Sequence, residues 1–328
     1  MSLFGRRKQA RDSRMFFTTD IHGSNRCFRK FLNSAEVYEA QTLVIGGDLT
    51  GKRLCPVVRR PNGEHTSEWA GRPLTLESAQ EVEEFKAKAA NAGLYAFVCA
   101  PEEAAALGAD AALVEAKFLE LAAGRLAEWV ELAEERLAGK DVQVIINCGN
   151  DDPFEFDEIL EGSRLVTFPE GRLVRIDERR TMASVGYANR TPWDCARDVE
   201  ESELRARIDA VVSQWDAPEG EHLLLNTHCP PYRTTIDQAA VLDEDLRPVT
   251  DGGQVVLGPV GSTAVREAIE EHQPLLSLHG HIHESRGVDR VGRTLCINPG
   301  SEYPEGVLRG AIVDFDRNGV KGYVLTSS

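Results

Sequence analysis

The sequence lacks the features of a membrane protein and of a disulfide-rich secreted protein. No hydrophobic run in its 328 residues approaches the length of a transmembrane helix. The basic stretch at residues 5–11 has no apolar segment after it, so we expect a frayed tail over residues 1–13 and no signal peptide. The seven cysteines are odd in number and include no Cys-x-x-Cys pair, which favours reduced thiols. These absences predict a cytoplasmic protein.

Positive charge is also scarce, since 37 Lys and Arg face 53 Asp and Glu and give a formal net charge of -16. Sequence-independent binding of nucleic acid needs a basic surface, so we do not expect nucleic acid as a general partner. Acidity does not exclude a phosphate-containing substrate, because bound metal ions invert the local potential. With 42% hydrophobic residues the chain can bury a sizeable core, and we expect one domain over residues 1–328.

Five apolar runs share one pattern, because each is followed by acidic, amide or imidazole side chains. Such runs are typical of buried strands, and open sheets place functional groups at the carboxyl ends of their strands. The residues that follow the runs are Asp20, His22, Asp48, Asn150, His228, His281 and His283. Oxygen and imidazole ligands without thiolate suit divalent manganese, iron, zinc or nickel. Seven ligands exceed one tetrahedral site and suit two ions that share a carboxylate.

The order Asp-x-His, Gly-Gly-Asp, Gly-Asn, His and Gly-His-x-His resembles the calcineurin-like metallophosphoesterases, in particular their small bacterial and archaeal phosphodiesterases. The resemblance covers most of the chain outside residues 52–140. It differs from the protein serine/threonine phosphatases, because the second motif continues here as Gly47-Asp48-Leu49-Thr50-Gly51. The family resemblance implies an α/β fold, a four-layer α/β/β/α sandwich of two mixed sheets.

The resemblance also implies the metal ligands and the reaction. One ion would be held by Asp20, His22 and His283, the other by Asn150, His228 and His281, with Asp48 bridging the two. Such a pair of ions activates a hydroxide that hydrolyses a phosphoester, here a small phosphodiester. A non-catalytic metal-binding scaffold of the same fold is the alternative, and a nuclease is disfavoured by the acidic chain.

Asp151 is the departure from the family pattern, because most members carry a histidine there that is thought to protonate the leaving group. An aspartic acid could replace it only if burial or the neighbouring Asp152 raised its pKa, whereas nearby metal ions would lower that pKa. We therefore interpret Asp151 as a residue that orients the substrate first, and as the catalytic acid second.

Residues 52–140 predict a helical insertion within the domain. We expect a loop over 52–69 and helices over 76–91, 101–108 and 110–137. The longest helix has an apolar stripe of Leu119, Ala123, Leu126, Val130, Ala133 and Leu137. The stripe can pack on the sheet or on the neighbouring helix, or it can form a homo-oligomer interface.

The remaining chain predicts a second sheet and its loops. Residues 164–187 suggest strands, Thr191 and Pro192 suggest the start of a helix to about residue 215, and residues 310–315 and 322–326 would complete the second sheet. The polar stretch 237–259 suggests a flap over the site. Asn189, Arg190 and Tyr232 are candidate substrate-binding residues, since arginine suits phosphate. A loop that only caps the following helix is the alternative for the first two.

Overall fold

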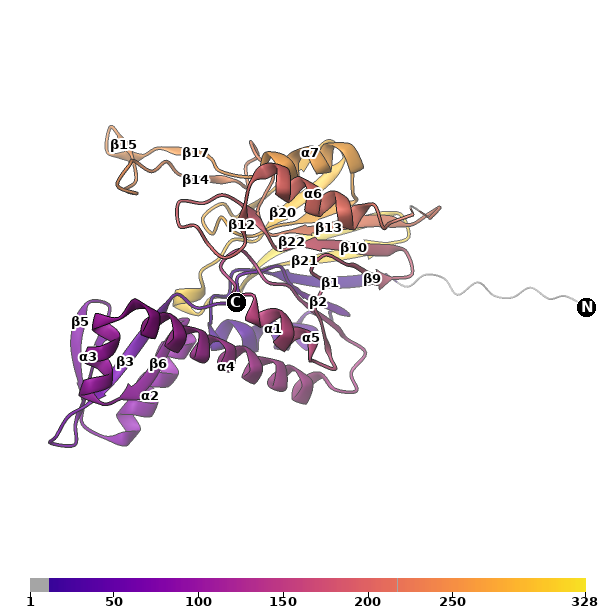
Figure 1. Cartoon of the computed structure of the whole chain (residues 1–328). Coiled ribbons are helices and arrows are strands. Elements are labelled where there is room, and N and C mark those ends of the chain that lie inside the picture. The colour runs from indigo at the N-terminus through magenta and orange to yellow at the C-terminus, as the bar shows by residue number, and fades with distance from the viewer. Residues whose placement is uncertain (1–11, 217) are drawn as a thin grey trace, which may run out of the picture.

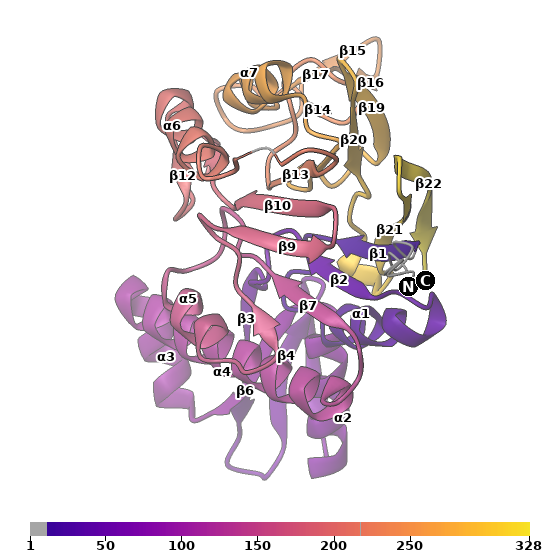
Figure 2. The ribbon, with the colours of Figure 1, turned by 90° about the vertical axis from the view of Figure 1, so that its right-hand side faces the viewer.

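The computed structural model describes residues 12–216 and 218–328. Of the frayed tail expected over residues 1–13, residues 1–11 lie outside the described chain, whereas Ser13 already belongs to the first strand. Two mixed six-stranded sheets form the body of the chain (Figures 1 and 2). The first runs β22 (Gly319–Ser327), β21 (Arg309–Asp316), β1 (Ser13–Thr18), β2 (Thr42–Ile45), β7 (Gln143–Ile146) and β8 (Val166–Thr167). The second runs β19 (Gly287–Val291), β20 (Thr294–Asn298), β18 (Leu276–Leu278), β13 (His222–Thr227), β10 (Arg180–Val185) and β9 (Leu173–Asp177). The mixed α/β class predicted from the sequence is therefore confirmed.

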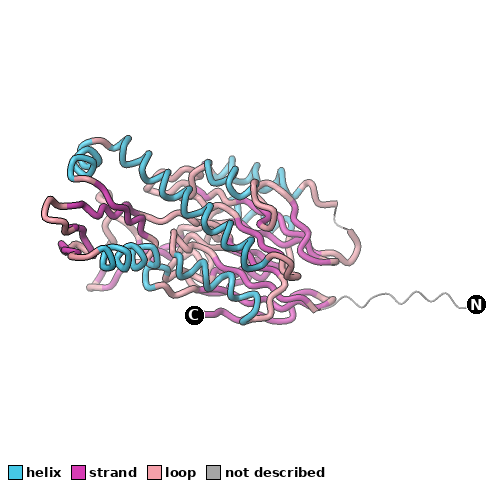
Figure 3. Tube along the Cα trace, turned by 90° about the horizontal axis from the view of Figure 1, so that it is seen from below, coloured by secondary structure: helices cyan, strands magenta, loops and turns pink. Residues whose placement is uncertain are grey.

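Apolar side chains from both sheets pack against each other in one cluster, in which Phe17 and Val44 of the first sheet join Leu224 and Ile297 of the second. The outer face of each sheet packs on helices. These are α1 (Asn25–Val37), α4 (Ala111–Leu137) and α5 (Glu155–Glu161) on the first sheet, and α6 (Glu201–Val212) and α7 (Thr263–His272) on the second. Seen from below, helices lie in front of the strands (Figure 3). None of the described helices has both the length and the apolar character of a membrane-spanning segment.

The central strands of both sheets are parallel to their neighbours, and this places the predicted ligands. In the first sheet β1, β2 and β7 pair in parallel, and in the second β13, β18 and β20 do. The carboxyl ends of parallel strands lie at one edge of a sheet, so the polar residues after β1, β2, β7, β13 and β18 come together there.

The final two strands correct the sequence prediction, because they belong to the first sheet. β21 pairs antiparallel with β1, with Met15 opposite Val313, and β22 pairs with β21. An alternating pattern predicts a strand with one buried face but does not say which sheet provides its partner. That partner, β1, lies about three hundred residues earlier in the sequence and is fixed only by the tertiary fold.

The insertion has the three expected helices but also a sheet, so the prediction of a loop over residues 52–69 is wrong and the insertion is α/β rather than helical. A four-stranded sheet contains β5 (Arg72–Leu76), β4 (His65–Trp69), β3 (Arg53–Arg59) and β6 (Leu94–Cys99) in that order, with α2 (Ala79–Asn91) and α3 (Pro101–Ala109) alongside. The prolines suggested a loop, yet Pro56 lies within β3, which pairs in parallel with β6. A proline removes one donor but leaves its carbonyl available, and Ser67 Oγ donates to that carbonyl at 2.8 Å.

Two further segments differ from prediction. The helix expected from Thr191 begins instead at Glu201, because residues 191–198 fold around the carboxylate of Asp198 and pair β11 (Ala188–Asn189) with β12 (Asp198–Val199). The stretch 237–259 forms an arm of two hairpins, β14 (Gln238–Ala240) with β17 (Leu257–Pro259) and β15 (Thr250–Asp251) with β16 (Gln254–Val255). The arm and the insertion project from the same side of the body (Figure 1). The role of this arm, residues 237–259, as a flap over the site stays a prediction.

The apolar stripe of α4 packs inside the chain. Leu126, Val130, Ala133 and Leu137 are buried in the cluster that joins α1, α5 and the first sheet, and Trp129 stacks on Phe28 with ring centroids 4.5 Å apart. Leu119 and Ala123 are only partly buried. The buried part of the stripe is therefore core of the chain, and a homo-oligomer through the rest of the insertion stays a prediction.

We expect Leu126→Ala to lower the free energy of unfolding by about 2–5 kcal/mol, because it removes a buried side chain and leaves a cavity. Leu113→Ala is the matched control on the same helix, since Leu113 is 45% exposed and its replacement should change stability by about 0.5 kcal/mol or less. Urea unfolding of both variants measures the difference. Equal midpoints for the two variants would contradict the burial of this stripe.

Candidate metal centre

Six of the seven predicted ligands form two groups at the carboxyl edge of the sheets. Asp20, His22, Asp48 and His283 form one group, and Asp48, His228 and His281 form the other. In each group, one nitrogen or oxygen atom of every residue lies within 4.8 Å of all the others. Asp48 belongs to both groups, as a bridging ligand would.

The two carboxylate oxygens of Asp48 face in different directions. Oδ2 lies 3.6 Å from Nε2 of His22, and Oδ1 lies 3.3 Å from Nε2 of His228. In the first group, Nε2 of His283 lies 3.0 Å from Nε2 of His22 and 3.3 Å from Oδ1 of Asp20. The other nitrogen of His22 lies 3.0 Å from the carbonyl of Thr50, which leaves Nε2 directed into the group.

Asn150, the seventh predicted ligand, is oriented by Asp198. Its amide nitrogen donates to Oδ1 of Asp198 at 2.9 Å, and its own Oδ1 is buried without a hydrogen-bond partner among the described residues. Within the same part of the chain, both ring nitrogens of His228 are likewise buried without a hydrogen bond. Unpaired buried polar atoms are costly and demand an explanation. Carboxylate, imidazole and amide donors with free lone pairs fit a divalent cation, so the residues present suit the metal that the family resemblance implies.

The backbone around these ligands adopts uncommon conformations. Asp20, His22, Asp48 and His281 all have left-handed φ angles, at 53°, 37°, 55° and 66°. Such angles are uncommon for residues other than glycine and cluster at functional sites. At Gly149, the Cβ atom of any other residue would lie 2.2 Å from Oδ1 of Asp48, so only glycine permits this close approach.

Asp152 holds two of these loops together, and the sequence did not identify it. Its buried carboxylate accepts hydrogen bonds from the backbone of Leu49, Thr50 and Gly149 and from the Thr50 hydroxyl, at 2.6–3.0 Å. Burial and the charge of Asp48 raise its pKa. Asp152 thereby fixes the loop of Asp48 against the loop of Asn150. Its only signal in the sequence is that a second aspartate follows Asp151.

The ionisable groups of the site have strongly shifted pKa values. Burial lowers the pKa of His22 to about 3 and that of His281 to about 4, so both imidazoles stay neutral as metal ligands must. Burial also lowers the pKa of His228, but the charge of Asp48 outweighs it and raises that pKa to about 9. Burial raises the pKa of Asp20, but the hydrogen bond with His283 and the charge of His228 bring it to about 2.

A cavity of about 570 Å³ opens onto both groups, and Asp48, Asn150, His281 and His283 contribute to its wall. Other lining residues are Lys52, Phe118, Asp151, Trp193 and Cys195. The backbone N–H of Asp151 donates to Oδ1 of Asp48 at 3.1 Å, which places this residue directly beside the shared carboxylate. The sequence identified Asp151, whereas Lys52, Trp193 and Cys195 were missed because no motif contains them.

The predicted substrate-binding residues do not line this cavity. Arg190 forms ion pairs with Asp194 and Glu200, which favours the alternative of a loop that caps α6. The side chain of Asn189 donates to the carbonyl of Val260 at 3.3 Å. The backbone of Tyr232 pairs with Ser262 and Arg266. A role for these three residues in substrate binding stays a prediction.

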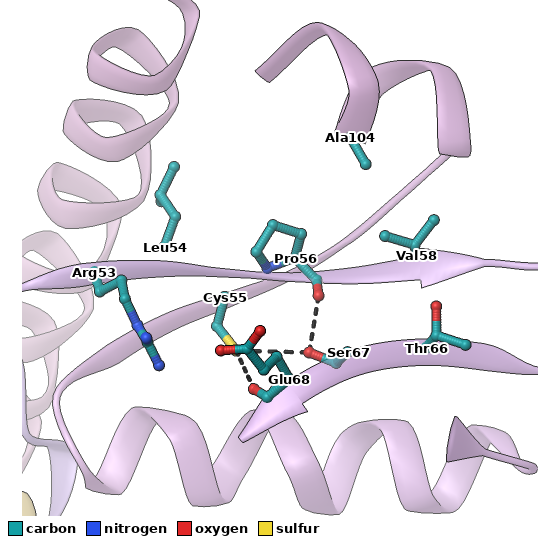
Figure 4. A pocket seen from close by; sticks show the side chains of 9 residues that line it. All are labelled: Arg53, Leu54, Cys55, Pro56, Val58, Thr66, Ser67, Glu68 and Ala104. Atoms are coloured by element: carbon teal, nitrogen blue, oxygen red, sulfur yellow. Dashed lines mark hydrogen bonds between the residues drawn. The ribbon is translucent and has the colours of Figure 1, made fainter. Parts of the chain in front are cut away.

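Another cavity, of about 360 Å³, lies on the insertion between β3, β4 and α3 (Figure 4). Its hydroxyl and thiol groups bond within the protein, since Ser67 donates to the carbonyl of Pro56 and the thiol of Cys55 lies 3.6 Å from Ser67 Oγ. It contains no histidine and none of the predicted ligands, so we place the candidate chemistry at the cavity beside Asp48.

No family model matches the chain. A stretch of 160 residues, 48% of this chain, is 29% identical to an uncharacterized protein of Methanocaldococcus jannaschii, MJ1162, and spans 64% of that protein. The structure of TT1561 from Thermus thermophilus matches with a TM-score of 0.52 at 12% identity, over 94% of this chain and 100% of that one. A second solved structure matches with a TM-score of 0.54 at 15% identity, over 96% and 99% of the two chains. At these identities the chain shares a fold with both.

Two phosphoesterases are also among the solved structures that match. One is described as a novel archaeal phosphodiesterase and the other as Yfce, a phosphoesterase from E. coli, each at 13% identity. They cover 96% and 95% of this chain and 99% and 98% of their own, with TM-scores of 0.30 and 0.29 that are too low to carry an argument. The activity of this chain is a separate proposal.

The buried imidazole of His279 provides a test of the electrostatics that does not remove a predicted ligand. Burial lowers its pKa to about 4 in the folded chain, against about 6.5 unfolded. Below pH 6.5 the unfolded chain binds this proton and the folded chain does not, so stability is lost as the pH falls from 6.5 towards 4. At pH 5 the loss from this one group is about 2 kcal/mol.

We therefore expect His279→Asn to lose less stability than the unmodified chain between pH 7 and pH 5, by about 2 kcal/mol. The measurement is urea unfolding in the presence of a chelator, so that bound metal does not contribute. All other titrating groups are common to both proteins and cancel in the comparison. Parallel curves of stability against pH would show that His279 is not buried in its neutral form.

Proposed function

We propose that this chain is a metal-dependent phosphoesterase of the calcineurin-like type, which hydrolyses a small phosphodiester at a centre of two divalent ions. The observation that carries the proposal is the shared carboxylate of Asp48, whose two oxygens face His22 in one group and His228 in the other. A single-ion site has no need of two ligand groups on opposite sides of one carboxylate. Helices outside two facing sheets, as in the α/β/β/α sandwich of that family, support the same proposal.

Each ligand has a definite part in this proposal. Asp20, His22 and His283 would hold one ion, and Asn150, His228 and His281 the other, with Asp48 contributing to both. Two bound divalent ions supply Lewis acidity towards phosphoryl oxygens and a nucleophile at neutral pH. Manganese, iron, zinc or nickel would suit these donors.

The protein residues around the ligands keep the site in its geometry before substrate arrives. Asp198 fixes the amide of Asn150, because its carboxylate accepts from the amide nitrogen, and the amide oxygen is left without a hydrogen-bond partner among the described residues. Asp152 clamps the loops of Asp48 and Asn150. Preorganised ligands of this kind need no rearrangement during the reaction.

A non-catalytic metal-binding scaffold is the second candidate, and Asp151 is the observation that favours it. The family histidine that is thought to protonate the leaving group is absent at this position. A protein that still binds metal but no longer catalyses the reaction would keep the predicted metal ligands and lose this catalytic histidine. Metal content and hydrolysis therefore have to be measured on the same sample.

We expect two equivalents of manganese per chain after reconstitution, measured by elemental analysis. Asp48→Ala should lose both ions because each group depends on its carboxylate, whereas His283→Ala should mainly weaken one site, by about 10-fold or more in affinity. Asp209→Ala is the control, because that carboxylate pairs with Arg205 on α6 and belongs to neither group. A stoichiometry that saturates at one ion would contradict the two-ion proposal.

With both ions bound, we expect hydrolysis within a panel of phosphomonoesters and phosphodiesters, with aryl diesters among the best substrates. Asp48→Ala should be inactive in the same assay, and Asp209→Ala should retain the activity of the unmodified chain. If the fully loaded protein hydrolyses no ester in the panel, the scaffold replaces the phosphoesterase as the proposed function.

A further inference from the structure

The leaving group of the proposed reaction needs a partner that Asp151 does not provide on its own. Both of its carboxylate oxygens are already engaged, since Oδ2 forms an ion pair with Lys52 and Oδ1 accepts from the thiol of Cys195 at 2.9 Å. The carboxylate of Asp151 therefore acts as an acceptor that positions Lys52 and Cys195, not as a free proton donor. One of these neighbours is the ammonium of Lys52.

We propose that Lys52, positioned by Asp151, is the cationic group that contacts the departing ester oxygen in this chain. The inference rests on the proposed function and assigns a catalytic role that neither the motifs nor the family resemblance gives to this residue. Lys52 lies four residues after Asp48, directly before β3. The loop that carries Lys52 is therefore fixed at one end by Asp48 and at the other end by strand β3 of the insertion.

A short series of contacts connects Lys52 with the shared carboxylate. The backbone N–H of Asp151 donates to Asp48 at 3.1 Å, and the side chain of Asp151 pairs with Lys52. Lys52 is also the only lysine or arginine among the described residues that line the cavity of about 570 Å³. An ammonium held there therefore shares the cavity with Asp48, Asn150, His281 and His283.

The other cationic side chains near this loop are committed elsewhere. Arg197 is fully buried and bonds Asp157 and the carbonyls of Asp152 and Pro153. Arg190 pairs with Asp194 and Glu200. Lys52 is 46% exposed at its side chain, and a lysine has three N–H donors on a flexible stem, so it can keep Asp151 and still donate to a ligand.

The chemical step is then balanced without a proton from Asp151. The oxygen of a water molecule forms a bond to phosphorus while the bond from phosphorus to the ester oxygen breaks. The departing oxygen keeps the electron pair of that bond, and an N–H of Lys52 donates to it while its negative charge develops. The attacking water releases one proton to solvent, and the departing alkoxide or phenolate takes up one proton from solvent after departure, so that one water is consumed per ester and the protons balance. Stabilising charge where it develops is the contribution with the largest effect in comparable sites.

The test compares Lys52→Met, which keeps the stem and removes the charge, with Lys52→Arg, which keeps the charge. Both are assayed with manganese on aryl diesters whose leaving groups span a range of pKa. We expect Lys52→Met to lower kcat by about 100-fold for the poorest leaving groups and by much less for the best, which steepens the dependence on leaving-group pKa. Lys52→Arg should recover most of the loss. Lys86→Met is the matched control, because Lys86 forms an exposed ion pair with Glu83 on α2.

Metal content and thermal unfolding of each variant show whether the site is intact. If Lys52→Met loses metal or unfolds, Asp151→Asn provides the second measurement, since it releases Lys52 without removing its charge and should steepen the same dependence to a smaller degree. An equal loss for every leaving group, or a change in KM alone, would overturn the role of Lys52 and leave the phosphoesterase proposal standing. An unmodified protein that holds two ions but hydrolyses no ester would overturn both.

Discussion

The burial of three carboxylates in one small volume is the constraint on which the rest of this structure depends. Asp20, Asp48 and Asp152 are all almost completely buried, within loops that follow β1, β2 and β7. A buried charge is tolerated only when it is paired or bonded by many donors. Asp152 satisfies this need with backbone N–H groups, whereas Asp20 and Asp48 do so with histidines from the second sheet. The two sheets are therefore connected by electrostatics as well as by their shared apolar cluster.

The same constraint explains why the site lies where the two sheets meet. His22 comes from the first sheet, and His228, His281 and His283 come from the second, so the groups form only when both sheets are in register. The left-handed φ angles at four ligands are strained backbone that the surrounding packing has to support. Because Gly149 has no side chain, the loop after β7 can lie directly against Asp48 in the loop after β2.

Segments outside the two sheets determine what surrounds the candidate centre. The insertion contributes Phe118 and the loop before β3 contributes Lys52, while the loop folded around Asp198 contributes Trp193 and Cys195. Asp198 has two roles, because one carboxylate orients Asn150 and also holds the backbone of Thr191 and Cys195. The orientation of a predicted ligand and the shape of the cavity wall are thus coupled through one side chain. Differences in substrate among proteins with this fold can arise from such segments while the strand ends stay the same.

Local patterns along the chain were sufficient to predict the central strands and to name the six residues that the fold brings into two candidate metal-binding groups. Apolar runs that end in Asp, Asn or His carry this signal, because side chains at the ends of buried parallel strands have to meet at one edge. The helices α2, α3 and α4 of the insertion were also predicted from the sequence, α4 by its apolar stripe. Other features required the three-dimensional fold: the sheet that receives β21 and β22, the place of Pro56 in a strand, and the loop of residues 191–198 around Asp198. The contact of Lys52 with Asp151 also required the three-dimensional fold, because these residues are about one hundred positions apart in the sequence. Pairing partners and ion pairs of this kind depend on distances across the fold, and no spacing along the chain encodes them.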